Sequence, residues 1–217
     1  MKTKSTRSNH AAVTLVEVLV VVATLALLVA IIVPALKPAK ASVSPFHCVN
    51  FLQQVGLGFR MWANDNREKF PWHVSTNEGG TMELVGTGEA WRHFVAASNE
   101  LNSPKILRCP TDMSRTRAST WSNFGNQNLS YFVGLEADET KPNTILSGDR
   151  NLMTNGVALK PGLVVLSTNS VPGYTTELHN GAGNFALGDG SAQQVNPAAL
   201  ARQFIAGGTN VIRLLIP

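Results

Sequence analysis

The chain has 217 residues, of which 44% are apolar and 15% are charged, and this leaves room for an apolar anchor and one globular domain of about 150 residues. The formal net charge is +4 at pH 7. Three of the basic residues, Lys2, Lys4 and Arg7, precede the first apolar run, so the rest of the chain carries a net charge of only +1. The charge balance is therefore no argument for a nucleic-acid partner, and we expect none.

An apolar run follows this basic start and extends from Leu15 to Val33. As a helix, its 19 residues would span roughly 28 Å, close to the hydrocarbon thickness of a bilayer. Only Glu17 and Thr24 interrupt it. Because basic residues flank the run on its N-terminal side, the positive-inside rule predicts a single-pass inner-membrane protein. The N-terminus would be cytoplasmic and the bulk of the chain periplasmic or extracellular.

The segment Ala12-Val13-Thr14-Leu15-Val16-Glu17-Val18 resembles the cleavage and methylation motif of type IV pilins and type II secretion pseudopilins. In that family a small residue, usually Gly, precedes Phe-Thr-Leu-x-Glu. The resemblance implies that a prepilin peptidase cuts after Ala12 and methylates the new amine of Val13. It also implies that Glu17 is the fifth mature residue and that Pro34, the twenty-second, kinks the helix. This chain departs from the pattern with Ala in place of Gly and Val in place of Phe.

Glu17 also calls for a physical explanation, because a carboxylate inside a membrane-length run is costly unless a cation pairs with it. Cleavage would leave an ammonium at Val13, one helical turn away on the same chain or close by on an adjacent subunit. Such pairing would remove a cost of several kcal/mol for an unpaired buried charge. We therefore expect Glu17 to be an assembly residue. The alternative is that its side chain reaches the interface near the start of an ordinary anchor helix.

Two other interpretations of the N-terminal segment remain open. A secretory signal peptide has a basic start, an apolar stretch of about 7 to 15 residues and a small-x-small cleavage site, and Ala39-Lys40-Ala41 supplies such a site. The apolar run here is longer than that stretch and contains Glu17, which favours the prepilin interpretation. A plain uncleaved anchor is the other alternative.

The segment after the anchor contains Pro34, Pro38 and Pro45, which predict a kinked or locally melted section. Helical spacing of apolar residues then resumes and ends at the turn-rich Asn64-Asp65-Asn66. The members of this stripe are Cys48, Phe51, Leu52, Val55, Phe59 and Trp62. The pattern resembles the second half of the pilin spine helix, which packs on a head domain.

The head sequence breaks into short segments separated by Gly, Pro, Asn and Asp, which is typical of an antiparallel sheet. Strands are expected at Lys105 to Arg108, Leu129 to Val133, Thr144 to Ser147, Leu163 to Ser167, Asn184 to Leu187 and Ala192 to Val195. Short helices are expected at Trp91 to Ala97 and at Pro197 to Ala206, the second with Pro in its first turn and Gly207 after it.

The expected fold class is therefore α+β and pilin-like. A long N-terminal α-helix would be transmembrane in its first half and packed on the head in its second half, and the head would be a mainly antiparallel β-sheet. The expected parts are a basic leader (1–12), a transmembrane and assembly helix (13–34), a kinked continuation (35–65) and a head domain (66–217).

Cys48 and Cys109 are the two cysteines of the chain. An even pair outside the cytoplasm is compatible with a disulfide between the spine helix and the head. Such a bridge would close a long loop and contribute about 4 kcal/mol in the chain-entropy model. Two free buried thiols that never meet are the alternative, because sequence does not give their separation.

The stretch from His179 to Asp189-Gly190 has nine residues between His and Asp-Gly. It resembles the H-X9-DG motif of prepilin-type proteins from planctomycete and verrucomicrobial bacteria. Segments elsewhere in the chain resemble others that recur in that group, and they begin at Cys48, Trp62, Phe70, Cys109 and Ser147. Together with the N-terminal motif, the resemblance covers most of the chain.

The chemistry of the H-X9-DG motif is open. Asp149 and Asp189 are hard oxygen donors of the type that Ca²⁺ prefers, and the resemblance to pseudopilins, which bind calcium in the head, makes Ca²⁺ the candidate cofactor. The favoured interpretation is structural, with Asp189-Gly190 in a hairpin turn and His179 hydrogen-bonded to a neighbouring loop.

An enzyme is not expected. Ser147, Asp149, His179 and Asp189 include the residue types of a hydrolase triad, but no sequence signal places them together. The chain has no Gly-x-Ser-x-Gly elbow, no His-Glu-x-x-His, no phosphate-binding loop and no Cys-x-x-Cys. No catalytic residue is therefore assigned.

The sequence favours a structural subunit that is cleaved and N-methylated by prepilin peptidase and assembled through its N-terminal helix into a pilus or a type II secretion pseudopilus. Its partners would be the inner membrane, the peptidase, other pilin or pseudopilin subunits and the assembly platform. The alternative is a membrane-anchored extracytoplasmic binding module that recognises a polysaccharide or a secreted protein.

Overall fold

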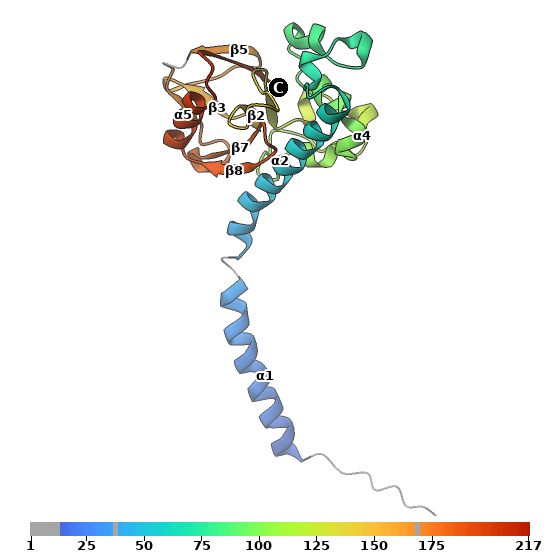
Figure 1. The fold of residues 1–217 in the computed structure, drawn as a ribbon. Helices are drawn as coiled ribbons and strands as arrows, with labels where there is room; N and C mark the ends of the chain where they lie inside the picture. The colour runs from blue at the N-terminus through green and yellow to red at the C-terminus, as the bar shows by residue number, and fades with distance from the viewer. Residues whose placement is uncertain (1–13, 37–38, 168–169) are drawn as a thin grey trace, which may run out of the picture. The chain divides into compact units, whose positions relative to one another are not determined.

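The computed structural model describes residues 14–36, 39–167 and 170–217 (Figure 1). The chain divides into two compact units, Met1–Val43 and Ser44–Pro217. The boundary falls inside the segment 35–65, which the sequence assigns to the continuation of the N-terminal helix. The expected α+β class, with an N-terminal apolar helix and an antiparallel sheet, is confirmed.

Helix α1 (Leu15–Leu36) is built almost entirely from apolar residues. Its window Leu15–Ile32 has a mean hydropathy of 3.0, and none of that window is buried. Among the residues that the structure describes, α1 is the one helix long and apolar enough to cross a membrane. The expected membrane-length helix is therefore present, whereas its topology stays a prediction.

The prolines after this run interrupt the helices less than expected. Helix α1 continues through Pro34 to Leu36, and α2 (Ala39–Asp65) already includes Pro45. Pro45 is close to the start of a helix of 27 residues, so the single backbone hydrogen bond that it removes is a small part of the total. Pro45 itself is therefore helical, whereas the expected kinked or locally melted section stays a prediction, because residues 37–38 between α1 and α2 lie outside the described residues. Pro38 lies outside the described residues, and the kink at Pro34 stays a prediction.

The second half of α2 packs on the head domain through the predicted apolar stripe. Five of the six predicted side chains are buried, Phe51 is half-buried, and α2 ends at Asp65 within the predicted turn. Phe59 lies at the centre of an aromatic cluster, with its ring centroid 5.3 Å from that of Trp72 and 5.2 Å from that of Phe94. Leu57 and Met61 lie on the opposite face and are exposed. Burial of one face therefore holds this helix in place.

The centre of the head is a six-stranded antiparallel sheet (Figure 1). Its strands, in spatial order, are β5 (Gly162–Ser167), β9 (Val211–Ile216), β1 (Tyr131–Gly134), β2 (Ile145–Asp149), β7 (Gly183–Leu187) and β8 (Ala192–Val195). Strands β7 and β8 form a hairpin in which Phe185 pairs with Gln193, and β2 pairs with β7 through Gly148 and Phe185.

The two faces of this sheet bury different cores. Tyr131, Val133 and Ala186 join the core beneath α2, whereas the alternate residues Phe132 and Phe185 join a second core. This alternation follows from the two-residue period of a strand. The second core is closed by α5 (Pro197–Ala206) and by a three-stranded sheet of β4 (Val157–Ala158), β3 (Leu152–Thr154) and β6 (Pro172–Tyr174).

Short helices fill most of the chain between α2 and the sheet. Two are α-helical, α3 (Trp91–Ala96) and α4 (Ser98–Leu101). The 3₁₀ helices are η1 (Pro71–His73), η2 (Thr76–Glu78), η3 (Met82–Thr87), η4 (Pro104–Leu107), η5 (Trp121–Asn123) and η6 (Asn126–Asn128), with η7 (His179–Gly181) later in the chain.

Most predicted elements are present within one or two residues of their expected bounds. Helix α5 has the predicted bounds because Asn196 caps it, with its Oδ1 accepting from the Ala199 N–H at 2.9 Å, and Pro197 occupies its first turn. The predicted strand at Lys105 to Arg108 is wrong. Ser103 and Pro104 start the 3₁₀ helix η4 there instead. Four strands were not predicted, namely β3, β4, β6 and β9.

Candidate functional site

The N-terminal site is described from Thr14 onward, and the predicted cleavage junction Ala12-Val13 lies outside the described residues. Thr14 and Glu17 form a capping box at the start of α1. The Thr14 N–H and hydroxyl donate to Glu17 Oε2 at 2.8 and 2.9 Å, and the Glu17 N–H donates to Thr14 Oγ1 at 3.3 Å. The carboxylate that was predicted for assembly thus also accepts from the backbone N–H and the hydroxyl of Thr14 at the start of the helix. The Thr-x-x-Glu spacing was a readable signal for it.

The two ends of the H-X9-DG motif lie in different places. His179 comes before β7, in the left-handed η7 turn, and Asp189-Gly190 follows β7 in the turn to β8. Asp149 lies beside Asn184 at the start of β7, five residues from Asp189, or roughly 16 Å along a strand. The structure therefore does not bring Asp149 and Asp189 together, as a shared calcium site would need. Strand β7 keeps them apart.

The Asp189-Gly190 end of the motif makes the predicted hairpin turn. Asp189 Oδ1 accepts from the Ser191 N–H at 2.9 Å, and Gly190 has a φ of 82°, a conformation that favours glycine. The turn rests on α2 at Gly56, where an added Cβ would lie 3.0 Å from the Gly190 carbonyl oxygen. Arg60 of α2 donates from Nη1 to the Asp189 carbonyl oxygen at 2.7 Å. A glycine that weakens α2 in isolation is thus the point where the turn approaches the helix.

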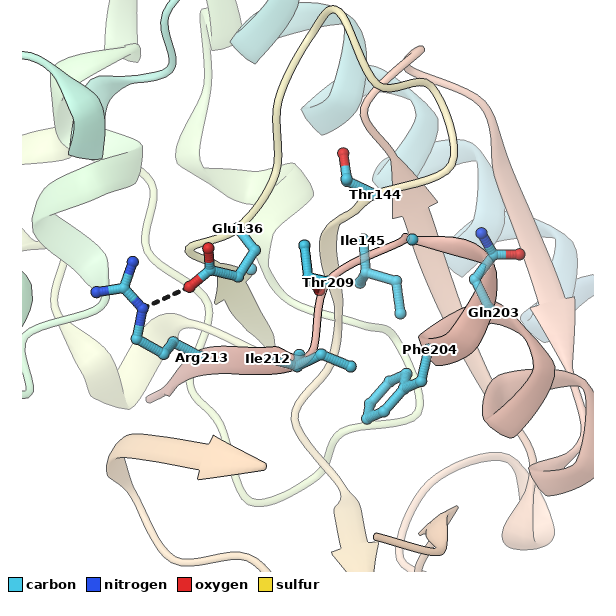
Figure 2. Close-up of a pocket in the computed structure, with 10 residues that line it drawn as sticks. Glu136, Thr144, Ile145, Gln203, Phe204, Thr209, Ile212 and Arg213 are labelled. Carbon is cyan, nitrogen blue, oxygen red and sulfur yellow. Dashed lines mark hydrogen bonds and ion pairs between the residues drawn. The ribbon is translucent and has the colours of Figure 1, made fainter. Parts of the chain in front are cut away.

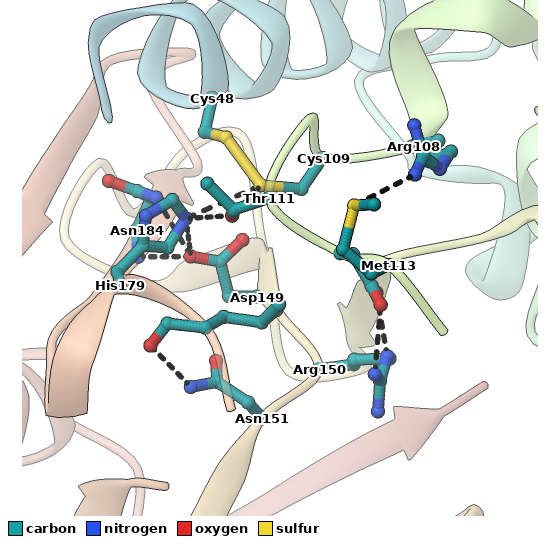
Figure 3. The surroundings of a disulfide bond; sticks show 12 residues. Cys48, Arg108, Cys109, Thr111, Met113, Asp149, Arg150, Asn151, His179 and Asn184 are labelled. Atoms are coloured by element: carbon teal, nitrogen blue, oxygen red, sulfur yellow. Dashed lines mark hydrogen bonds and ion pairs between the residues drawn. A yellow bond between two sulfur atoms is a disulfide. The ribbon is translucent and has the colours of Figure 1, made fainter. Parts of the chain in front are cut away.

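The His179 end of the motif lies beside a disulfide between Cys48 and Cys109 (Figure 3). The two Cα atoms are 5.5 Å apart, and both cysteines are fully buried. Cys48 lies on α2 and Cys109 on the loop after η4, with a sequence separation of 61. The bond therefore fastens the spine-like helix to the head, as the disulfide alternative predicted.

His179 Nε2 lies among three polar atoms at nearly equal distances. It is 3.3 Å from Cys109 Sγ, 3.5 Å from Thr111 Oγ1 and 3.4 Å from Asp149 Oδ2 (Figure 3). The side chain is 1% exposed, and burial lowers the pKa of His179. The imidazole is therefore neutral at pH 7. Its φ of 52° is uncommon for a residue with a side chain, so the fold holds this histidine at some conformational cost.

Asp149 is the most perturbed acid of the site. It is fully buried, and burial raises its pKa to about 7, against the opposing effect of two hydrogen bonds from Asn184. The Asn184 N–H and Nδ2 donate to Asp149 Oδ2 at 2.7 and 2.8 Å. Asp149 Oδ1 is buried without a hydrogen-bond partner among the described residues. Because His179 is neutral, the contact between these two side chains is not an ion pair at pH 7.

An ion-pair network fixes the loop that carries Cys109. Arg150, which directly follows Asp149, donates from Nε and Nη2 to the two carboxylate oxygens of Asp112 at 2.8 and 3.0 Å. Its Nη1 also donates to Glu177 Oε2 at 3.3 Å. Burial alone would raise the pKa of Asp112, but hydrogen bonds from Arg150 and Ser114 outweigh it, and the net pKa is lowered. This bidentate pair is the strong form of a salt bridge.

The residue types of a hydrolase triad are only partly brought together. Asp149 and His179 are in contact, but the Ser147 hydroxyl donates to the Phe132 carbonyl oxygen at 2.7 Å and is fully buried. Asp189 belongs to the distant hairpin turn. The arrangement therefore supplies no serine nucleophile beside the histidine.

A separate pocket lies between β9 and the end of α5 (Figure 2). Its cavity volume is only about 20 Å³, far below the usual range for small-molecule sites of roughly 300 to 1,000 Å³. The Glu136–Arg213 ion pair borders it, and the Gln203 amide already donates to the Asn143 carbonyl oxygen at 2.8 Å. We assign no ligand to this pocket.

Sequence reasoning named His179, Asp149 and both cysteines, but it missed that they form one cluster. Asn184 and Thr111 were not singled out at all. The pairing of β2 with β7 brings Asp149 to Asn184, and no local sequence signal indicates such a long-range pairing.

Comparisons of the chain with protein-family models, with curated proteins and with solved structures find no match.

Proposed function

We propose that this protein is a prepilin-like structural subunit, processed between Ala12 and Val13 and assembled through α1 into a pilus or a secretion pseudopilus. The observation that carries the proposal is the composition of α1. Its apolar window Leu15–Ile32 is exposed on all sides and holds one carboxylate, Glu17, in its first turn. A helix of this kind needs lipid or other apolar helices around it.

The fastening of α2 supports the same proposal. An assembly subunit must transmit load from its helix to its head, and α2 is joined to the head by a buried aromatic stripe and by the Cys48–Cys109 disulfide. The Gly56–Gly190 approach adds a third attachment, two helical turns from Cys48 along α2. Both ends of the H-X9-DG motif thus lie against α2 or its disulfide. In this proposal the motif has a structural role.

Processing is tested by the intact mass and N-terminal sequence of the membrane-extracted chain after co-expression with a prepilin peptidase. The proposal expects a chain that starts at N-methylated Val13. A chain that starts at Met1 in the presence of an active peptidase would instead support the anchored binding module. A start at Ser42 would identify the apolar run as an export signal.

Assembly is tested by Glu17→Ala, with Thr24→Ala as the matched control. Both changes remove a polar side chain from the same helix, but Thr24 only donates to the Val21 carbonyl oxygen within α1. We expect Glu17→Ala to remain in the membrane fraction and to be absent from sheared filaments, and Thr24→Ala to be present in both. Filaments that contain Glu17→Ala at normal levels would contradict the assigned role.

A further inference from the structure

Three side chains from distant parts of the chain converge on one buried point. Cys48 Sγ, Cys109 Sγ and His179 Nε2 lie within 4.8 Å of one another. They come from α2, from the loop after η4 and from the turn before β7. Thiolate sulfur and imidazole nitrogen are the ligand types that Zn²⁺ prefers. The cluster therefore has the composition of a zinc site as well as that of a disulfide with a neighbour.

The separations fit a tetrahedral ion. With Zn–N and Zn–S bonds of about 2.05 and 2.3 Å, the N···S edge of a tetrahedral site is about 3.6 Å, and an N···O edge is about 3.4 Å. His179 Nε2 lies 3.3 Å from Cys109 Sγ and 3.4 Å from Asp149 Oδ2. Two of the six edges of the tetrahedron are thus nearly in place. The S···S edge requires the two sulfurs to separate to about 3.8 Å once their bond is broken.

Asp149 is the candidate fourth ligand, because its carboxylate contacts His179. Asp149 lies outside the group of three ligand atoms that gather within 4.8 Å, so it must move closer to the sulfurs to bind the ion. Its carboxylate is fully buried, Oδ2 contacts His179 Nε2, and Oδ1 is without a partner among the described residues. A buried carboxylate oxygen without a hydrogen bond is costly, and a cation would relieve that cost. Asn184 orients the same carboxylate through two hydrogen bonds, as outer residues of metal sites commonly do.

We propose that reduction of the Cys48–Cys109 disulfide creates a structural Zn²⁺ site formed by both cysteines, His179 and Asp149. A dithiol reductant breaks the S–S bond by exchange and becomes a disulfide itself, leaving two protein thiols. Zn²⁺ then binds both sulfurs as thiolates, and the two thiol protons pass to solvent. His179 binds as the neutral imidazole through Nε2. The proposal is independent of the assembly role.

The burial of the four residues makes this site a structural one. Both cysteines and Asp149 are fully buried, and the His179 side chain is 1% exposed. Four protein ligands leave no open position for a reacting water, unlike a catalytic zinc site. The ion would join α2 to the same loop that the disulfide joins. Zinc and the disulfide are therefore alternative links between α2 and the loop that carries Cys109, and the redox state determines which of them forms.

The first experiment uses the full chain in detergent, reduced with a phosphine and titrated with Co²⁺ as the spectroscopic probe. We expect one equivalent to bind, with thiolate-to-cobalt charge transfer and the intense visible bands of tetrahedral Co²⁺, and one equivalent of Zn²⁺ to remove both signals. The disulfide-bonded chain should give neither signal. A reduced chain without stoichiometric tetrahedral bands would overturn the proposal.

Matched variants separate this site from binding by two loose thiols. We expect His179→Ala to weaken Zn²⁺ binding by more than about 100-fold, since loss of a ligand should cost at least as much as loss of an outer residue. Asp189→Asn, at the other end of the same motif, should bind as the wild type does. Equal affinity of the wild type and His179→Ala would refute the assignment.

Folding supplies a readout that needs no variant. One equivalent of Zn²⁺ should raise the urea midpoint of the reduced wild-type chain towards that of the oxidised chain, because the ion binds the folded cluster. An unchanged urea midpoint would show that zinc does not link α2 to the Cys109 loop.

Co²⁺ spectra of Asp149→Ala test the fourth ligand. We expect weaker visible bands for this variant, and spectra identical to those of the wild type would contradict the role of Asp149.

Discussion

At its His179 end, the H-X9-DG motif meets α2 in a buried polar cluster that is closed by a covalent bond. At its Gly190 end, it meets the same helix mainly through backbone, with Gly56 and Gly190 in close approach and a hydrogen bond from Arg60 across the contact. The first attachment depends on protonation and redox state, and the second on steric fit. One short motif therefore holds the helix by two different interactions, a covalent and polar attachment at one end and close backbone packing at the other.

The largest expected effect comes from breaking the covalent attachment. Cys48→Ala with Cys109→Ala should lower the free energy of unfolding by about 4 kcal/mol, because the bridge closes a long loop. The measurement is urea unfolding of the full chain in detergent under oxidising conditions. Reduction of the wild type in the presence of a chelator should reproduce most of the loss. A loss below about 1 kcal/mol would show that the noncovalent contacts hold α2 by themselves.

The second effect is a pH dependence at the His179 end. The folded state raises the pKa of Asp149 to about 7 from an ordinary value of 3.8. Between these values the folded chain therefore holds more protons than the unfolded chain, and stability from this group falls as pH rises. Below about pH 4 no stability from this group is lost.

Asp149→Asn isolates that dependence in the disulfide-bonded protein. His179, Asp112 and Arg150, which surround the carboxylate, remain in both proteins, so their contributions largely cancel. The stability of the wild type relative to Asp149→Asn should decline from pH 4 to pH 7 and then level off. A difference that is constant over this range would show that the Asp149 carboxyl keeps its ordinary pKa.

The third effect is at the Gly190 end, where we expect a Gly→Ala substitution in α2 to lower the free energy of unfolding rather than raise it. Gly→Ala in a helix normally stabilises by about 1 kcal/mol, but a Cβ on Gly56 would lie 3.0 Å from the Gly190 carbonyl oxygen. We expect Gly56→Ala to cost a net of about 1 kcal/mol through overpacking. Gly86→Ala, where nothing lies within 4 Å of the added Cβ, is the control and should be neutral to slightly stabilising. Stabilisation by Gly56→Ala would mean that the turn moves freely away from α2.

The smallest effect concerns the polar link at the same end. Arg60→Ala should cost about 0.5 kcal/mol, the low end for a typical hydrogen bond, because the Arg60 side chain that donates to the Asp189 carbonyl oxygen is 40% exposed. Arg60 Nε also lies 3.2 Å from Glu139 Oε1, so Glu139→Gln serves as the control that removes only the ion pair. Equal losses in the two variants would assign the effect to Glu139 rather than to the turn.

Sequence was sufficient where the signals are local. The cap Asn196, the proline Pro197 and the final Gly207 of helix α5 all lie in the helix or next to its ends. Its predicted bounds are those observed. The buried stripe of α2 follows from helical spacing alone. The strand expected at Lys105 to Arg108 failed because Ser103 and Pro104 start a 3₁₀ turn there, a signal that outweighs the apolar residues after it.

Sequence was insufficient where contacts join distant segments. Strand β9 takes its place between β5 and β1, but its own residues do not specify those neighbours. The contact of His179 with Asp149 depends on the pairing of β2 with β7 and on a left-handed turn at His179. Neither is written in the local residue types. The cysteine pair could be proposed from sequence, but the 5.5 Å between its Cα atoms could not.

Because the side chains of β7 are buried on alternate faces, the number of residues between the two ends of the motif determines which face each side chain occupies. Phe185 faces one core and Ala186 the other, so one inserted residue between His179 and Asp189 would exchange every later side chain of β7 between the two faces. Along α2, the distance from Cys48 to Gly56 is eight residues, or about 12 Å. The two attachments are thus connected twice, once along α2 and once along β7. A change in either would leave only one of the two fastenings in reach.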